Sequence, residues 1–340
     1  IKHSEGEHME RIRLGSTGLK VSPFSFGTMT LGEPVNEETS LDLLDLVTDS
    51  GVNFIDTSNS YNAGRSEEII GQWMNARANR EQIVLATKVR YPVGNDSETI
   101  GLTPKVLIRE LENSLRRLKT EYVDIYYLHQ PDDDTPIEVT WRALESQVNA
   151  GKIRYIGLSN FAAWQIVDAL YLSRSRGWTP PTVTQALYNA ISRAADTELL
   201  PMTRAFDLGT CLYNPLAGGL LTGKYQIGQE PTSGTRFAND ANYRQRYWDE
   251  RQRHAADAFS QIARDGGRST VELALRYMLD HDSVDVTLFG ATRPEQITAN
   301  LAALEATPLD DDERAACDTV WQALHGPVPR YNRTNARPGT

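Results

Sequence analysis

Eight short apolar segments alternate with amphipathic helical patterns along most of this 340-residue chain. Each apolar segment suits one buried strand, and most of the segments between them carry Leu, Ile and Val at three- and four-residue spacing, which indicates helices. The predicted strands are residues 24–29, 52–58, 83–89, 122–129, 153–159, 182–185, 210–216 and 284–290. Repeated β-α units form either an open doubly wound sheet or a closed barrel, and eight units favour the barrel.

No G-x-G-x-x-G turn follows the first strand, which removes the usual reason to choose a Rossmann sheet. The predicted fold class is therefore α/β, a (β/α)8 TIM barrel formed as a single domain by residues 10–333. An N-terminal β-hairpin is expected from RIRL and LKVS around Gly15 and Gly18, with long loops at the C-terminal face. The longest, residues 220–250, has the length of a lid or binding loop.

The two ends of the chain and its charge set further expectations. Residues 1–9 lack an apolar run and an initial Met, so we expect an expression remnant or a disordered lead-in, and residues 334–340 a tail. A formal net charge of −10 argues against nucleic acid and anionic membranes as partners. Two cysteines without metal spacing favour a reducing cytoplasm and no metal site. A small molecule is the expected partner, and a homo-oligomer stays open.

Polar side chains stand at the ends of three neighbouring predicted strands. Asp56 ends one strand and has Tyr61 five residues later, Lys88 ends the next, and His129 ends the third. Functional groups of a (β/α)8 barrel gather where its strands end, so these four side chains are expected to meet at one rim. Asp56 would offset the cost of burying the Lys88 charge.

This grouping suits the reduction of a carbonyl group. A cationic Lys88 beside the Tyr61 phenol is expected to lower the phenol pKa from about 10, which makes Tyr61 a usable proton donor. His129 could orient the carbonyl oxygen. Taken singly, Asp56 and Lys88 also fit a structural ion pair, and His129 fits a buried core histidine. Their joint position favours catalysis.

Two further segments are typical of phosphate binding. Residues 214–225 contain three glycines whose backbone can approach an anion, followed by Lys224. Residues 289–301 place Pro294 at a first helical position, with Arg293 beside the helix N-terminus. Loops after the last two strands commonly bind phosphate in this fold. Each segment alone also fits a glycine-rich turn or a capped helix.

From Arg11 to about Arg333 the sequence resembles the aldo-keto reductases. The resemblance rests on FIDTSNSYNAGRSEEIIG, ATKV, LENSLRRLKTEYVDIYYLHQPD, GKIRYIGLSNF and NPLAGGLLTGKY, in the family's order and spacing. Within the family, ALYNAISRAADTELLP, YRQRYWDE and PRYNR are most similar to the aflatoxin-aldehyde and succinic-semialdehyde reductases. Natural-product ketoreductases of bacteria and potassium-channel β-subunits lie nearby.

The resemblance implies a catalytic tetrad of Asp56, Tyr61, Lys88 and His129, and NADPH bound in an extended form. The nicotinamide-binding positions it implies are Ser159, Asn160, Gln185 and Tyr213. The implied pyrophosphate positions are Asn214, Leu216, Gly218 and Lys224, and the implied adenosine positions are Arg293, Gln296 and Asn300.

The sequence departs from the family pattern in two places. Residues 62–65 lengthen the segment between Tyr61 and Ser66, as in the channel-subunit and aflatoxin-aldehyde branches. A lysine that holds the 2′-phosphate in many members is missing near Gly290, so Arg293 would have to replace it and NADH stays open as an alternative to NADPH. Channel β-subunits lack the histidine that is present here as His129, which favours a working reductase.

The predicted function is NADPH-dependent transfer of hydride to an aldehyde or ketone, with Tyr61 as the proton donor. Two alternatives stay open: a pathway-specific ketoreductase for a keto-sugar or polyketide side chain, and an NADP(H)-sensing subunit. Arginines and aromatic residues in the long loop and near the C-terminus could bind an anionic or a large hydrophobic substrate. The substrate residues predicted there are Arg246, Tyr247, Trp248 and Arg333.

Overall fold

A computed structural model of the chain describes residues 9–225 and 227–327, and within them eight parallel strands close into a barrel. The strand order around the barrel is β10-β3-β4-β5-β6-β7-β8-β9, which confirms the predicted (β/α)8 fold. The strands are β3 (Phe24–Gly27), β4 (Phe54–Asp56), β5 (Val84–Val89), β6 (Val123–Leu128), β7 (Ile153–Ser159), β8 (Pro181–Leu187), β9 (Gly209–Tyr213) and β10 (Val286–Phe289). The barrel closes where β10 pairs with β3, with Phe289 opposite Phe26.

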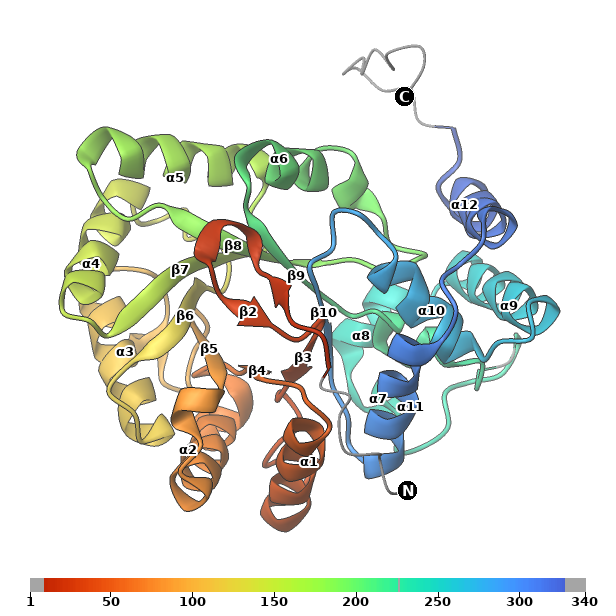
Figure 1. The fold of residues 1–340 in the computed structure, drawn as a ribbon, viewed down its shortest axis with the longest axis horizontal. Helices are drawn as coiled ribbons and strands as arrows, with labels where there is room; N and C mark the ends of the chain where they lie inside the picture. The colour runs from red at the N-terminus through yellow and green to blue at the C-terminus, as the bar shows by residue number, and fades with distance from the viewer. Residues whose placement is uncertain (1–8, 226, 328–340) are drawn as a thin grey trace.

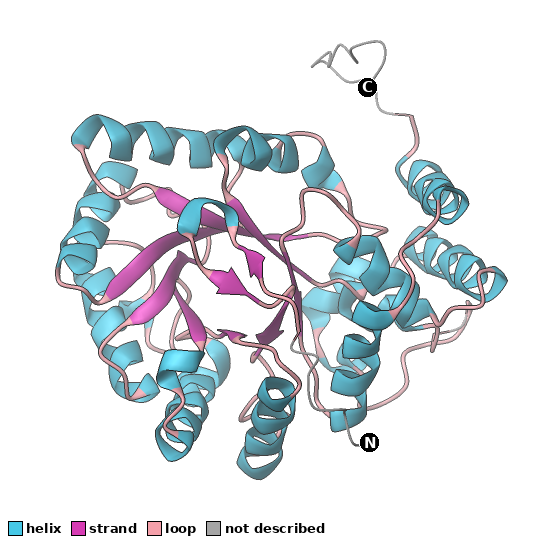
Figure 2. Ribbon diagram, viewed as in Figure 1, coloured by secondary structure: helices cyan, strands magenta, loops and turns pink. Residues whose placement is uncertain are grey.

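Helices surround the strands in an outer layer (Figure 1; Figure 2). Six of them follow β3 to β8 in turn: α1 (Glu37–Asp49), α2 (Arg65–Arg77), α3 (Pro104–Leu118), α4 (Ile137–Asn149), α5 (Ala163–Arg176) and α6 (Leu199–Phe206). α9 (Glu250–Asp265) and α10 (Thr270–Leu279) precede β10, and α11 (Pro294–Glu305) and α12 (Asp311–His325) follow it. Local sequence fixes the first residues of several helices. The Thr103 side chain caps α3 before Pro104, and the Asn36 side chain caps α1 by accepting from the Thr39 N–H at 2.9 Å.

The predicted hairpin closes the N-terminal end of the barrel (Figure 1). Its strands are β1 (Ile12–Arg13) and β2 (Lys20–Val21), shorter than the stretches predicted for them, and they are joined by the 3-10 turn Gly15–Thr17. The Tyr155 hydroxyl from β7 donates to the Thr17 carbonyl oxygen at 2.5 Å. A Cβ on Gly15 would lie 2.1 Å from the backbone nitrogen of Gly209, so only glycine allows this close approach.

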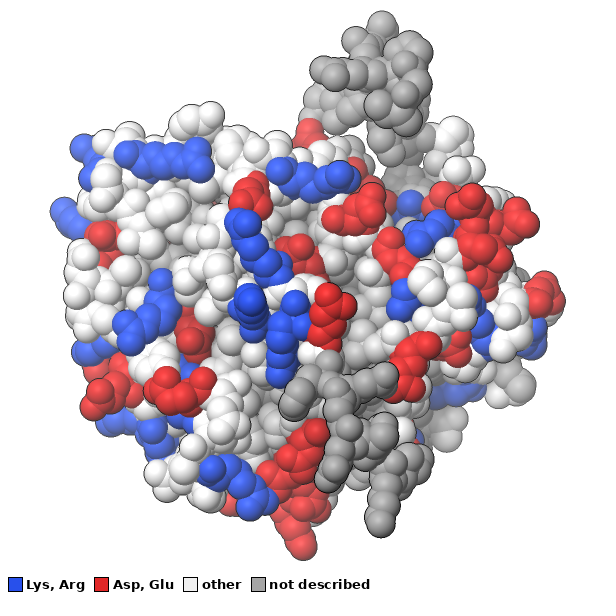
Figure 3. Space-filling view, viewed as in Figure 1, with Lys and Arg blue, Asp and Glu red and all other residues white. Residues whose placement is uncertain are grey.

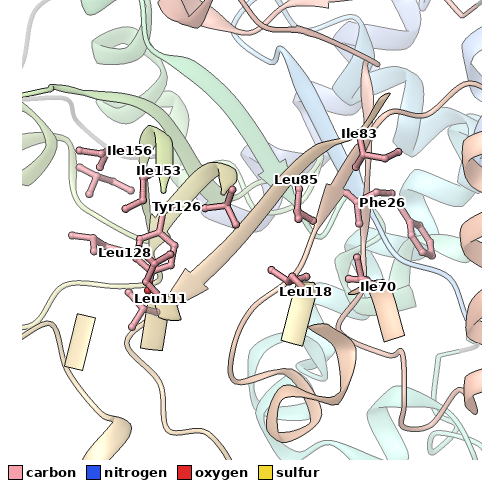
Figure 4. Close-up of a cluster of buried hydrophobic side chains, with 14 of the residues drawn as sticks. Phe26, Ile70, Ile83, Leu85, Leu111, Leu118, Tyr126, Leu128, Ile153 and Ile156 are labelled. Atoms are coloured by element: carbon pink, nitrogen blue, oxygen red, sulfur yellow. The ribbon is translucent and has the colours of Figure 1, made fainter. Parts of the chain in front are cut away.

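Two apolar layers form because side chains alternate along each strand. Inside the barrel, a cluster that includes Phe54, Ile125 and Cys211 packs below the C-terminal rim. Outside it, strand residues such as Leu85 and Leu128 pack against helix residues such as Leu111 (Figure 4). A Cβ at position 157 would lie 2.3 Å from the Tyr127 ring, so the glycine in β7 leaves room for this ring in the interior.

The long segment after β9 is not one uninterrupted loop. A 3-10 turn at Ala217–Thr222 is followed by two short helices, α7 (Arg236–Asn239) and α8 (Ala241–Tyr247), before α9 begins at Glu250. Tyr243 of α8 occupies the space that a side chain on Gly218 would need, since a Cβ there would lie 2.7 Å from the ring. The helices α7 and α8 therefore lie over the glycine-rich segment.

Two sequence expectations fall wholly or largely outside the described residues. Of the predicted lead-in 1–9 only Met9 is described, and the predicted tail 334–340 lies beyond the described residues altogether. In the part of the chain that the structure describes, no helix is long and apolar enough to cross a membrane. Lys and Arg side chains are interspersed with Asp and Glu on the face drawn in Figure 3.

Candidate active site

The four residues predicted at the strand ends lie together at the C-terminal rim. Asp56 ends β4, Lys88 lies near the end of β5, His129 follows β6, and Tyr61 opens the 3-10 turn Tyr61–Gly64. The Lys88 ammonium donates to the Asp56 carboxylate, and its Nζ lies 3.3 Å from the Tyr61 hydroxyl oxygen. The structure therefore brings these side chains into contact as the sequence indicated.

The Asp56–Lys88 ion pair is almost completely buried, with 2% of the Asp56 side chain and 0% of the Lys88 side chain exposed. Burial alone would lower the pKa of Lys88, but the Asp56 carboxylate and the Tyr61 phenol outweigh it and raise this pKa, so the ammonium stays charged. Burial raises the pKa of Asp56, against the opposing effects of Lys88 and of the Gln185 amide. Gln185 Nε2 donates to Asp56 Oδ2 at 2.9 Å.

The Tyr61 phenol differs from the sequence prediction in the net direction of its pKa. Burial is the largest influence and raises the pKa of Tyr61, while the neighbouring Lys88 charge lowers it only in part. The expected effect of Lys88 is present, but burial outweighs it, so the prediction of a lowered pKa is wrong. The phenol therefore keeps its proton at neutral pH, which is the form that can donate.

The turn after Tyr61 explains how the longer segment 62–65 is accommodated. Asn62, Ala63 and Gly64 have φ values of 49°, 55° and 90°, a run of left-handed residues directly before α2. The Asn62 side chain stabilises this backbone because its Nδ2 donates to the carbonyl oxygens of Leu31 at 2.7 Å and Glu33 at 2.9 Å. The turn fixes Tyr61 between β4 and α2.

His129 is held from several sides. Its ring makes T-shaped contacts with the rings of Tyr61 and Tyr91, whose centroids lie 5.9 and 4.8 Å from its own. Its Nδ1 lies 3.3 Å from Ser58 Oγ, and its carbonyl oxygen accepts from Asn160 Nδ2 at 2.9 Å. Burial, helped by the positive charge of Lys88, lowers the pKa of His129 well below the usual 6.5, so the ring is neutral at pH 7.

The residues predicted to hold the nicotinamide surround the same rim. Ser159 ends β7 and Tyr213 ends β9, and Asn160 links them: its Nδ2 lies 3.1 Å from Ser159 Oγ, while the Tyr213 hydroxyl donates to its Oδ1 at 2.8 Å. Asn160 adopts a φ of 60°, which turns the chain out of the barrel after β7. Gln185 lies in the same group, with its amide nitrogen on Asp56.

The predicted pyrophosphate segment follows β9 and offers a site for an anion. Asn214, Leu216, Gly218 and Lys224 all lie between β9 and α7, and Asn214 Nδ2 is buried with no hydrogen-bond partner among the described residues. The Lys224 Nζ lies 3.6 Å from the point that a Cβ on Gly219 would occupy. An unpartnered buried donor, a side-chain-free backbone and an ammonium group fit a bound phosphate chemically.

The predicted adenosine segment lies at the start of α11. Arg293 immediately precedes the helix, and Pro294 takes the first helical position as predicted. Gln296 Oε1 accepts from the Thr292 backbone N–H at 2.7 Å, and Asn300 is buried. The adenosine segment follows β10, which pairs with β3 in the barrel. It therefore lies at the same end of the barrel as the pyrophosphate segment.

Three of the four predicted substrate residues, Arg246, Tyr247 and Trp248, follow one another in the described chain, and their side chains have different neighbours. The Arg246 guanidinium, on α8, lies 5.6 Å from the Tyr243 ring centroid. Burial raises the pKa of Tyr213 to about 12, and the nearby Arg246 charge partly opposes this shift. Tyr247 is 1% exposed and accepts from Asn189 Nδ2 at 3.4 Å. Trp248 packs against Tyr225 and Phe237. Arg333 lies outside the described residues.

Two residues at the site were missed by the sequence reasoning. Ser58 is the last residue of the predicted strand 52–58, and Tyr91 lies two residues after the predicted strand 83–89. Their position at or just after a predicted strand end was the available signal. The two cysteines are free and buried, and no group of three or more His, Cys, Asp or Glu in the described ranges could hold a metal ion.

The fold and the site define a barrel enzyme whose reactive groups lie at the carboxyl ends of its strands. The sequence profile of the aldo/keto reductase family matches residues 23–322, and the chain belongs to this family of oxidoreductases.

The chain is similar to known proteins over nearly its whole length. An uncharacterized oxidoreductase, YrpG of Bacillus subtilis, is 35% identical over 94% of this chain and 98% of its own length. Aflatoxin B1 aldehyde reductase member 2 of Rattus norvegicus is 35% identical over 90% of this chain and 86% of its own. A probable voltage-gated potassium channel subunit beta of Oryza sativa is also 35% identical, over 88% of this chain and 93% of its own length.

Proposed function

We propose that this protein is an NADPH-dependent reductase that transfers hydride to the carbonyl carbon of an aldehyde or ketone, with Tyr61 as the proton donor. The observation that carries the proposal is the Lys88 ammonium, which contacts both the Asp56 carboxylate and the Tyr61 hydroxyl inside the barrel rim. The similarity to aflatoxin B1 aldehyde reductases agrees with carbonyl reduction.

The cofactor is proposed to lie extended across the rim. A reduced nicotinamide supplies the hydride when it is bound. Ser159, Asn160 and Gln185 would hold its carboxamide, and Tyr213 would stack on its ring. The pyrophosphate would lie against Asn214, Leu216, Gly218 and Lys224, and the adenosine end against Arg293, Gln296 and Asn300. Arg293 would favour NADPH over NADH by meeting the 2′-phosphate.

The chain's own side chains have distinct tasks in this proposal. Tyr61 Oη holds the proton that the substrate oxygen receives, and the Lys88 charge stabilises the phenolate that remains. Asp56 keeps Lys88 charged within the barrel and fixes its position. Neutral His129 donates a hydrogen bond to the carbonyl oxygen and orients it toward Tyr61.

The substrate is proposed to be a small carbonyl compound that carries an anionic group. This proposal is supported by Arg246, whose guanidinium lies near Tyr213 and forms no ion pair with a carboxylate of the described residues. A guanidinium at this position can bind a carboxylate or a phosphate. The aromatic rings of Tyr91 and Tyr243 would pack against its apolar part. The two free cysteines agree with a cytoplasmic location.

The test is turnover by Tyr61→Phe, measured as NADPH and NADH oxidation with 4-nitrobenzaldehyde, succinic semialdehyde, a 1,2-diketone and a bulky ketone. Loss of the donor is expected to lower kcat by about 10²- to 10⁴-fold, because general acid catalysis contributes that much. Binding of NADPH, followed by fluorescence, should stay nearly unchanged. Tyr171→Phe, at an exposed position on α5, is the matched control. Near-normal turnover by Tyr61→Phe would exclude this role.

The behaviour of the unaltered protein separates the alternatives. Preference for succinic semialdehyde over the uncharged aldehydes would support the role of Arg246. Turnover of the bulky ketone alone would indicate a pathway-specific ketoreductase. Tight binding of the nucleotide without turnover of any of the four compounds would favour a sensing subunit.

A further inference from the structure

The two ring nitrogens of His129 have different surroundings. Nδ1 lies 3.3 Å from the Ser58 hydroxyl oxygen, whereas Nε2 makes no hydrogen bond to the described residues. A neutral imidazole carries its proton on one nitrogen only, so the hydrogen bond at Nδ1 decides whether Nε2 is a donor or an acceptor. Only a protonated Nε2 can donate to a carbonyl oxygen.

The other contacts of Ser58 indicate which way its own proton points. The Ser60 backbone N–H donates to Ser58 Oγ at 3.3 Å, and the two serine hydroxyl oxygens lie 3.0 Å apart. A serine hydroxyl has one proton and two acceptor lone pairs. When Ser60 donates from both its N–H and its O–H, both lone pairs of Ser58 are occupied, and the Ser58 proton is left for His129 Nδ1.

The reversed arrangement leaves the site less well matched to a carbonyl substrate. If Ser58 donated to Ser60, His129 would donate from Nδ1, and Nε2 would turn a lone pair toward the carbonyl oxygen. Ser60 is half-buried, so its hydroxyl oxygen can accept from solvent while its proton goes to Ser58, whereas Ser58 is completely buried. This difference in exposure favours donation from Ser60 to Ser58 to His129.

We propose that Ser58 is a positioning residue: its hydroxyl donates to Nδ1 of His129 and holds the ring as the Nε2–H tautomer, ready to donate to the substrate oxygen. The ring is also fixed in place by Tyr61 and Tyr91 on its sides and by the hydrogen bond from the His129 backbone N–H to the Val89 carbonyl oxygen at 2.9 Å. Ser58 therefore controls the proton of the ring, while its neighbours control its orientation. The catalytic consequence rests on the function proposed above, but the tautomer does not.

The direct test is nitrogen-15 NMR of the full chain labelled at histidine, in which ring nitrogen shifts and ring couplings distinguish the tautomers. The chain has six histidines, and His129→Gln identifies the signals of this one. We expect the Nε2–H tautomer in the unaltered protein and in Ser58→Thr, which keeps the hydroxyl, and a mixture of tautomers in Ser58→Ala. An Nδ1–H tautomer in the unaltered protein, or unchanged tautomer populations in Ser58→Ala, would overturn the proposal.

Kinetics provide a second readout. Losing one neutral hydrogen bond is expected to lower kcat of Ser58→Ala by about five- to tenfold, without a change in NADPH affinity. Ser58→Thr should restore kcat to within about twofold, as expected for a lost hydroxyl and not for lost packing. Ser173→Ala removes an equally buried hydroxyl far from the rim and is the control. Equal kcat values in Ser58→Ala and Ser173→Ala would contradict the proposal.

These outcomes distinguish the failure of this proposal from a failure of the proposed function. If the unaltered protein reduces no carbonyl compound, the reductase proposal fails, while the NMR spectra still decide the role of Ser58. If Ser58→Ala does not fold, the tautomer in the unaltered protein and in Ser58→Thr still decides it. Active protein with an Nδ1–H tautomer would refute the role of Ser58 alone.

Discussion

The buried ion pair between Asp56 and Lys88 makes a prediction about stability as well as activity. Lys88→Met keeps the volume of the side chain but leaves the Asp56 carboxylate, which is 2% exposed, without its counter-charge. Asp56→Asn keeps a side-chain oxygen that can accept from Lys88, as the Thr57 carbonyl oxygen does at 2.8 Å, but it removes the negative charge that compensates the buried ammonium. Each single change therefore isolates a buried charge.

Removing one partner of such a pair costs about 3–5 kcal/mol of unfolding free energy, because the remaining charge has lost its compensation and has not regained water. An unfolding entropy of about 2.1 cal/mol/K per residue over 340 residues converts that loss into a decrease in Tm of about 4–7 °C. The double variant Asp56→Asn/Lys88→Met contains neither charge. Its loss should be clearly smaller than the two single losses added together.

The measurement is urea unfolding of the four proteins in the cycle, followed by circular dichroism, with NADPH oxidation on the same preparations. Lys105→Met is the control because Lys105 and Glu98 form an exposed pair, 75% and 71% accessible. It should cost less than about 1 kcal/mol. A loss below about 1 kcal/mol in Lys88→Met, or simple additivity in the double variant, would refute the reasoning about burial.

Two further predictions concern pH and packing. Because burial holds the pKa of His129 well below 6.5 in the folded protein, the unfolded chain takes up this proton more readily than the folded protein as the pH falls from 7.5 to 5.5. This group should therefore lower the unfolding free energy over this range, by at most about 1.4 kcal/mol, and urea unfolding of His129→Gln should show a smaller pH dependence; an equal dependence would contradict it. Gly71 of α2 lies against α3, since a Cβ there would be 2.1 Å from the Arg117 carbonyl oxygen. Gly71→Ala should therefore lower the unfolding free energy by about 1–3 kcal/mol, whereas helix propensity alone would raise it by about 1 kcal/mol.

The barrel and its four central side chains followed from sequence patterns with a direct physical basis. A buried parallel strand must be a short apolar run, and polar residues at its carboxyl end must lie at the rim, so Asp56, Lys88 and His129 could be grouped by their places in the sequence alone. Tyr61 joined them because it follows Asp56 within one short turn. These inferences needed only the order of the strands around the barrel.

Other properties depend on three-dimensional packing that no local pattern encodes. The pKa of Tyr61 is set mainly by its burial, which depends on all the segments around it, so the effect of Lys88 alone gave the wrong net direction. Residues 220–250 have no clear periodicity, and α7 and α8 were not predicted there. The surroundings of Trp248 could therefore not be read from the sequence. Ser58 was overlooked because its partner His129 is distant in the chain.

The pairing of β10 with β3 has a consequence for synthesis of the chain. β3 is complete at Gly27, but the strand that satisfies its free backbone groups ends only at Phe289. Until then the growing chain is an incomplete sheet with two unpaired edges, and such edges invite pairing with other chains. Most contacts between neighbouring β-α units can form as the ribosome advances, whereas ring closure must wait for almost the entire polypeptide. Premature termination before β10 would thus produce an open, aggregation-prone sheet and not a smaller barrel.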